Sequence, residues 1–169
     1  NRLIEEFMLL ANKSIASYVG KPKNKTAPQA FVYRIHDEPD AERISALSVL
    51  VKGLGYHLDF SSKKKLISSL NNLQKNVKGE KQEGLFEKLI VRSMAKAVYS
   101  TKNIGHYGLG FDFYSHFTSP IRRYPDLIIH RLLEKYLTKK SSVGAVDLEK
   151  ICKHSSEMEK RAAMAERDS

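Results

Sequence analysis

The segment His116-Phe-Thr-Ser-Pro-Ile-Arg-Arg-Tyr-Pro-Asp126 is the most distinctive part of this sequence, and we name it the signature segment. It combines two prolines, two adjacent arginines, two hydroxyl side chains, a histidine and an aspartate, and it leads directly into an apolar run. Each proline fixes its φ angle at about −65° and lacks a backbone N–H, so the backbone of Arg122 and Arg123 has few alternative conformations. Rigidly held guanidinium groups beside free backbone N–H groups are suited to binding a phosphate.

Two helix starts are compatible with this segment. Ser119 could cap a helix with Pro120 at its first position, but Pro125 would then lie one turn inside and kink the helix. A start at Tyr124 places Pro125 in the first turn, where it is tolerated, and Asp126 near the positive end of the helix dipole. We therefore expect the later start, or a short turn followed by the main helix over residues 127–137.

The remaining chain predicts an α+β fold that is mainly α, with helices packed against a minor antiparallel sheet. Apolar residues at helical spacing predict helices over residues 3–19, 41–53, 63–77, 85–99 and 147–167. The first of these is apolar almost all the way round, which is typical of a buried helix. Alternation predicts a strand over residues 30–36, and the glycine- and aromatic-rich run 104–117 predicts two short strands or bent extended segments.

Composition indicates a basic globular protein. The chain has 169 residues, a net charge of +10 and 41% hydrophobic residues, a size at which one domain can bury a core. Residues 60–104 alone carry ten Lys or Arg against three Asp or Glu. This excess favours an anionic partner, nucleic acid ahead of a membrane, although a basic protein without such a partner has the same composition. The single cysteine, Cys152, excludes an intrachain disulfide and fits a reduced, cytoplasmic setting. No apolar run approaches the roughly 18 residues of a membrane span.

The signature segment, followed by Ile129-His-Arg131, resembles the signature of the ribonuclease II / ribonuclease R family, and ribonuclease R in particular. Further matches follow in the family's order: Leu3-Ile-Glu-Glu-Phe-Met-Leu-Leu-Ala-Asn12, Tyr33-Arg-Ile-His36, Gly105-His-Tyr-Gly-Leu109 and Ala165-Glu-Arg-Asp168. The resemblance implies a processive 3′→5′ exoribonuclease that hydrolyses single-stranded RNA to nucleoside monophosphates with Mg²⁺. It also implies that residues 1–169 are the C-terminal part of an RNB catalytic domain, a fragment that works with the upstream half of that domain and with flanking RNA-binding domains.

The seven aspartates do not predict a metal site in this chain. Metal-assisted phosphodiester cleavage needs clustered carboxylates, and only Asp37 and Asp40 are close in sequence, in a proline turn. The resemblance places the Mg²⁺ ligands in an aspartate cluster upstream of this chain, so we expect the fragment alone to be inactive. A Ser/His/Asp hydrolase is not favoured either, because no glycine-flanked nucleophile is present. His116, His106 and His130 are more simply structural, and Asp126 and His130 are spaced to pair.

The candidate site residues follow from the resemblance. Arg122 matches the arginine that contacts the phosphate near the scissile bond and stabilises its developing charge. Glu166 matches a glutamate near the RNA 3′ end, and Glu5 or Glu6 matches another active-site glutamate, with a preference for Glu6. Further residues are expected to face RNA: Arg123, Ser119, His116 and Tyr107. Core packing for Tyr107 and internal ion pairs for Arg122 and Arg123 are the competing interpretations. The competing function is a non-catalytic, basic RNA-binding module.

Overall fold

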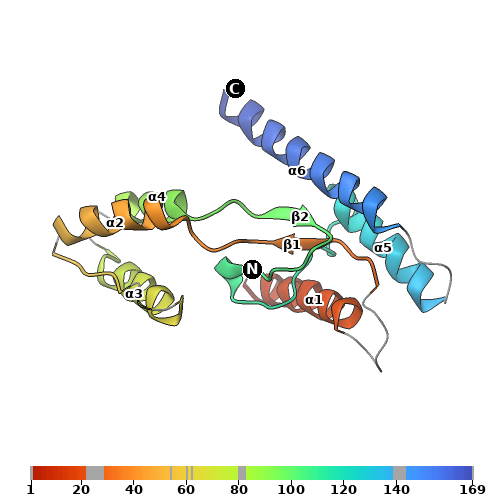
Figure 1. The fold of residues 1–169 in the computed structure, drawn as a ribbon, viewed down its shortest axis with the longest axis horizontal. Coiled ribbons are helices and arrows are strands. Elements are labelled where there is room, and N and C mark those ends of the chain that lie inside the picture. Colours follow the sequence, from red (N-terminus) through yellow and green to blue (C-terminus); the bar gives the residue numbers. More distant parts are fainter. Residues whose placement is uncertain are drawn as a thin grey trace. The chain divides into compact units, whose positions relative to one another are not determined.

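The computed structural model describes residues 2–21, 29–53, 55–59, 61, 63–79, 83–138 and 144–168. The α+β, mainly helical fold with a small antiparallel sheet is as predicted (Figure 1). In chain order its elements are α1 (Arg2–Gly20), β1 (Tyr33–Ile35), α2 (Ala41–Gly53), α3 (Lys63–Asn76), α4 (Glu83–Ser93), β2 (Val98–Ser100), the short 3-10 helix η1 (Tyr107–Leu109), α5 (Tyr124–Leu137) and α6 (Ala145–Asp168).

The chain folds as two compact units. The first, which we name the signature unit, consists of Asn1–Asp37 and Lys96–Ser169 and contains α1, both strands, α5 and α6. The second, the helical unit, is Glu38–Ala95 and contains α2, α3 and α4. The helical unit has its own core of buried residues, made of Leu47, Val51, Leu58, Leu70, Leu73, Val77 and Phe86. In neither unit is any described helix both long and apolar enough to cross a membrane.

Strand β1 lies at the centre of the signature unit. It pairs antiparallel with β2, and Arg34 lies opposite Tyr99. On the other side of β1, Arg34 donates its backbone N–H to the carbonyl of Tyr114 at 3.0 Å, and Ser115 donates its hydroxyl to the carbonyl of Val32 at 2.6 Å. The run 104–117 is thus bent and extended, with η1 and isolated bridges among its described residues rather than two strands. This arrangement delivers the chain to the signature segment.

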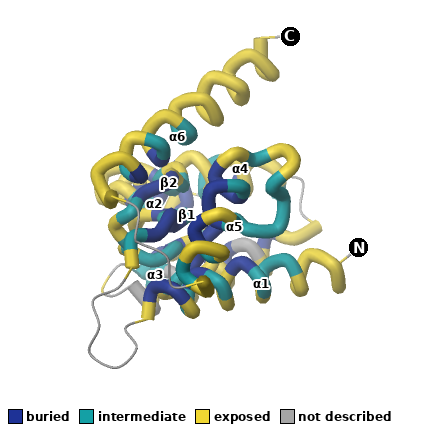
Figure 2. The backbone as a smooth tube through the Cα atoms, turned by 90° about the vertical axis from the view of Figure 1, so that its right-hand side faces the viewer, coloured by how far each residue is buried: buried dark blue, intermediate teal, exposed yellow. Residues whose placement is uncertain are grey.

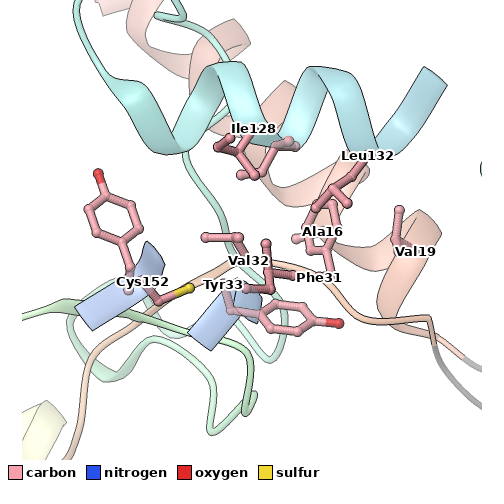
Figure 3. Packing of buried hydrophobic residues seen from close by; sticks show 11 residues of the cluster. Ala16, Val19, Phe31, Val32, Tyr33, Ile128, Leu132 and Cys152 are labelled. Atoms are coloured by element: carbon pink, nitrogen blue, oxygen red, sulfur yellow. The ribbon is translucent and has the colours of Figure 1, made fainter. Parts of the chain in front are cut away.

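The core of the signature unit joins its helices to β1. Figure 3 shows Ile128 and Leu132 pointing from α5 toward Val32, with Ala16 and Val19 of α1 alongside. Cys152 of α6 is buried in the same cluster, as is common for a free cysteine. The full buried cluster is Ala16, Val19, Phe31, Val32, Tyr33, Tyr99, Ile128, Ile129, Leu132, Leu148 and Cys152. Because α5 contributes its inner face to this core, the first turn of α5 is fixed relative to β1.

Two sequence predictions about helices are wrong. The helix predicted over residues 85–99 ends at Ser93, and Val98–Ser100 forms β2 instead. Valine and tyrosine favour strands, and the backbone N–H of Tyr99 is bound by the Ser156 hydroxyl at 2.9 Å. Helix α1 is not buried all round: Figure 2 shows its N-terminal half exposed, and Phe7 is 62% exposed. Only its C-terminal half reaches the core, so its apolar surface is wider than the area that the unit covers.

Gly20 ends α1 at a close approach, and we expect Gly20→Ala to destabilise the fold. A Cβ atom there would lie 2.6 Å from the Tyr33 hydroxyl and 2.7 Å from the Phe113 ring. Such overpacking costs about 1–3 kcal/mol, to be measured by urea denaturation. Gly53 is the matched control, because it also ends a helix and a Cβ there meets nothing within 4 Å. A Gly20→Ala variant as stable as Gly53→Ala would contradict this packing.

Candidate nucleic-acid interface

The signature segment forms a tight turn followed at once by α5. The backbone N–H groups of Arg122 and Arg123 both donate to the carbonyl oxygen of Ser119, at 3.3 and 3.0 Å. Arg123 is extended and occupies the N-cap position, and α5 begins at Tyr124 with proline in its first turn. The later of the two expected helix starts is confirmed, since a proline in the first turn removes no intrahelical hydrogen bond.

Asp126 holds this turn together from inside the protein. Its side chain is fully buried, and its Oδ2 atom accepts three hydrogen bonds. The donors are the backbone N–H of Ser119 at 2.8 Å and the Nε and Nη2 atoms of Arg123 at 3.1 and 2.8 Å. Asp126 therefore joins the start of the turn to its end, and the Arg123 side chain, 20% exposed, takes part in an internal ion pair.

The predicted pairing of Asp126 with His130 is wrong. The Nε2 atom of His130 lies 2.9 Å from the carbonyl oxygen of Phe117, and the two rings stack with centroids 4.0 Å apart. The Oδ1 atom of Asp126 is buried and has no hydrogen-bond partner among the described residues. Arg123 lies three residues before Asp126 and His130 lies four residues after it. The turn brings the Arg123 guanidinium to the Asp126 carboxylate, whereas His130 binds the backbone carbonyl of Phe117.

Two further polar side chains hold the segment from other elements. The buried Asn12 of α1 accepts the backbone N–H of Phe117 at 2.8 Å and donates to the Tyr114 hydroxyl at 3.2 Å. The hydroxyl of Tyr99 in β2 lies 2.9 Å from the Nδ1 atom of His116. The signature segment is thus held by side chains of α1, β2 and α5 together.

Burial and nearby positive charge keep His116 neutral. Burial, the Arg123 guanidinium and the Arg34 guanidinium lower the pKa of His116 to about 3. Burial is also the main cause that raises the pKa of Tyr99 to about 12. As expected of structural histidines, His116 and His130 are hydrogen-bonded, and His106 accepts the backbone N–H of Leu109 through Nδ1 at 3.3 Å.

Arg122 differs from its neighbour Arg123, whose guanidinium is paired with Asp126. Its side chain is exposed, and no hydrogen bond or ion pair of its guanidinium group is found within the described ranges. Its neighbour Ile121 is fully exposed as well. The backbone beneath Arg122 is fixed by the Ser119 carbonyl and by Asp126. The turn therefore presents a positively charged side chain to solvent on a rigid base.

The other candidate residues lie in different surroundings. Tyr107 is 8% exposed and belongs to the 3-10 helix η1, which corresponds to the core-packing interpretation. Glu5 and Glu6 are both exposed on the N-terminal half of α1. Glu166 is exposed near the end of α6. The structure thus gathers His116, Ser119 and Arg123 at the turn together with Arg122.

An ion pair that the sequence did not indicate orients α6. Both Nη atoms of Arg34 donate to the carboxylate of Glu159 on α6, at 2.6 and 2.9 Å. The same guanidinium lies over the ring of Tyr99, 4.5 Å from its centroid. Glu159 and Glu166 are seven residues apart and so lie on one face of the helix. Arg34, which lies on β1 opposite Tyr99, therefore connects the two-stranded sheet to α6, the helix that carries Glu166.

No group of three or more His, Cys, Asp or Glu side chains that could hold a metal ion is found among the described residues. The carboxylate best placed within the turn, Asp126, already binds a guanidinium and a backbone N–H through one oxygen. The residues of the turn thus suit an anion better than a divalent cation.

The family model of the RNB domain matches residues 1–139. The chain belongs to the RNB family. Ribonuclease R of Thermotoga maritima is 42% identical over 99% of this chain and 24% of its own length. DIS3-like exonuclease 2 of Schizosaccharomyces pombe is 36% identical over 100% of this chain and 19% of its own length. The RNB chain thus spans about a quarter or less of the length of these curated relatives.

Solved structures agree with this assignment. Mycoplasma genitalium RNase R, in complex with ribose-methylated single-stranded RNA, matches 98% of this RNB chain and 26% of its own length, with 31% identity and a TM-score of 0.81. Yeast Ssd1, described as a pseudonuclease, matches 90% of the chain at 22% identity and a TM-score of 0.74, and shares the fold. The predicted resemblance to the ribonuclease R family is confirmed.

Three residues of the site were not predicted. Tyr99 was placed inside a helix, and neither Arg34 nor Asn12 was assigned a role. A buried asparagine in an apolar helix is the strongest of these signals, because such a group needs hydrogen-bond partners. The contacts of Tyr99 and Arg34 depend on strand pairing that periodicity does not reveal.

Proposed function

We propose that this RNB chain is part of a processive 3′→5′ exoribonuclease that hydrolyses single-stranded RNA to nucleoside monophosphates with Mg²⁺. The observation that carries the proposal is the exposed Arg122 guanidinium beside the buried Arg123–Asp126 pair. Family membership and the RNA-bound relative support it. The two adjacent arginines have different roles: Arg123 stabilises the turn, and Arg122 contacts the phosphate.

Arg122 acts by electrostatic stabilisation. A guanidinium is always protonated and offers a planar set of donors that matches phosphate oxygens. Placed at the scissile phosphodiester, it favours the negative charge that develops during hydrolysis, provided that its position is fixed before the reaction. The hydrogen bonds of Ser119 and Asp126 fix the backbone that carries the Arg122 side chain. Glu166 and Glu6 are proposed to act near the RNA 3′ end, and the basic surface of the chain to form a wall of the RNA channel.

The Mg²⁺ ions would act as Lewis acids and activate the attacking water. The described residues hold no carboxylate cluster that fits such ions. We therefore assign the residues of this chain no role as Mg²⁺ ligands. We place the ligands of these ions outside residues 1–169, in the upstream half of the RNB domain, and expect this chain alone to be inactive. Flanking RNA-binding domains are the further expected partners.

A non-catalytic RNA-binding module is the second candidate. It is favoured by the net charge of +10 together with the lack of a metal-binding group among the described residues. Both candidate functions require RNA binding, but only the exoribonuclease hydrolyses RNA when the rest of the RNB protein is present. Hydrolysis by the longer protein therefore separates the two.

RNA binding is tested directly by a salt titration. We expect the chain to bind single-stranded RNA with an affinity that falls steeply with salt, since each neutralised phosphate contributes a slope of roughly −0.7. Arg122→Ala should weaken binding about fivefold to tenfold and reduce the slope by about 0.7. Arg43→Ala removes the same charge from an exposed position in the helical unit and serves as the control. Equal effects of the two substitutions, or no affinity at low salt, would refute a specific phosphate contact at Arg122.

A further inference from the structure

We propose that Tyr99 fixes His116 as the neutral tautomer that carries its proton on Nε2, and that this N–H donates to a non-bridging phosphate oxygen of the bound strand. The inference rests on the proposed RNA-binding function of the signature segment. It assigns a positioning role to Tyr99 and a ligand contact to His116. Phosphate is the ligand class because the contact offers an N–H donor together with the exposed guanidinium of Arg122.

The direction of the Tyr99–His116 hydrogen bond follows from what the phenol needs. Tyr99 is 5% exposed, and its hydroxyl has one partner among the described residues, the Nδ1 atom of His116 at 2.9 Å. If the phenol accepted a hydrogen bond from Nδ1–H, the O–H of this buried tyrosine would have no acceptor among the described residues, which is costly. If the phenol donates, both groups are satisfied. Nδ1 is then the acceptor, and the imidazole proton resides on Nε2.

The surroundings of His116 prevent it from becoming an imidazolium. Burial lowers its pKa to about 3, and the neighbouring charges act in the same direction. The His106 imidazole is itself held neutral, because burial and His36 lower its pKa to about 4. The titratable and charged groups that influence or contact His116 are Tyr99 on β2, Arg34 on β1, His106 and Tyr114 on the bent run, and Arg122 and Arg123 on the turn. None of these groups supplies a carboxylate to His116.

The Nε2 atom is left for a ligand. This Nε2 atom has no hydrogen-bond partner among the described residues. It is also not fully buried, so solvent reaches it. Arg34 and Arg123 are paired with Glu159 and Asp126, whereas Arg122 pairs with no carboxylate among the described residues. A neutral N–H donor near the Arg122 charge favours an anionic oxygen acceptor. Arg122 and His116 then bind one strand from a single turn. The Phe117 backbone between them is held by Asn12.

The test is a nitrogen-detected imidazole NMR titration of the chain, with and without a single-stranded RNA oligonucleotide. We expect the His116 resonances to show the Nε2–H tautomer, unchanged between pH 5 and 8, and the Nε2 resonance to shift on RNA addition. Tyr99→Phe keeps the ring but removes the donor, so a second tautomer should appear. Tyr56→Phe, in the helical unit, is the control and should leave the His116 tautomer unchanged.

Affinity measurements complete the test. His116→Phe preserves the ring contacts with Tyr99 and Tyr114, and it should weaken binding of RNA and of single-stranded DNA alike, by about tenfold. An Nδ1–H tautomer, titration of His116 near neutral pH, or an effect on RNA but not DNA would overturn the inference. Tight RNA binding without any shift at Nε2 would overturn it while leaving the proposed function intact. Failure to bind either strand would overturn both.

Discussion

Replacing Asp126 with alanine is expected to destabilise the signature unit by about 3–5 kcal/mol, because breaking a buried ion pair leaves the partner charge without compensation. Asp126 is fully buried, and the Arg123 side chain is only 20% exposed. The substitution also removes the acceptor of the Ser119 N–H. Urea denaturation at neutral pH measures the loss, and a shift of the midpoint at constant m-value assigns it to stability.

Asp147 provides a matched control for this prediction. It also pairs with a cation three residues away, Lys150, at 3.1 Å, but both side chains are about three-quarters exposed, 75% and 74%. Asp147→Ala is therefore expected to change the free energy of unfolding by less than about 0.5 kcal/mol. If Asp126→Ala were tolerated equally well, the proposed role of its carboxylate in holding the turn would be wrong.

Replacing Arg122 with alanine is expected to lower the rate of RNA hydrolysis by about 10²–10³-fold, the usual cost of removing one preorganised charge-stabilising group. The measurement uses the longer RNB protein that carries this segment, under single-turnover conditions with single-stranded RNA. Stability should be unaffected, because Arg122 is exposed and makes no contact among the described residues that folding requires. The loss should therefore appear in kcat at saturating RNA.

Arg122→Lys separates charge from geometry. Lysine keeps the positive charge but loses the planar, two-pronged donor set, so it should recover binding more fully than turnover. Arg43→Ala, which removes an exposed guanidinium from the helical unit, should leave turnover within about twofold, as expected for a single surface charge. Full turnover in both Arg122 variants would exclude the proposed catalytic role.

The conformation of the signature segment could be predicted because proline chemistry is local. Pro125 permits a helix start at Tyr124 and disfavours the earlier one, and the structure agrees. The partner of Asp126 could not be predicted in the same way. His130 and Arg123 are at comparable spacings, and the choice depends on where the carbonyl of Phe117 lies.

Long-range contacts explain the other differences. Tyr99 continues the apolar spacing of the preceding helix, so periodicity assigned it to that helix, whereas pairing with Arg34 makes it part of a strand. The error also hid the Tyr99–His116 contact, because a tyrosine in α4 would belong to the other unit. Likewise, the width of the apolar surface on α1 was evident from sequence, but the share of it that this unit covers was not.

The register of the two strands has a consequence for how the family can vary. Ile35 pairs with Val98, so the chain leaves β1 and re-enters β2 at neighbouring points, and the whole of Glu38–Ala95 is an insertion between the arms of a hairpin. Segments tethered at two adjacent points can lengthen, shrink or be exchanged with little effect on their host. We therefore expect changes in the length of this insertion to leave the contacts that hold the turn around Arg122 intact.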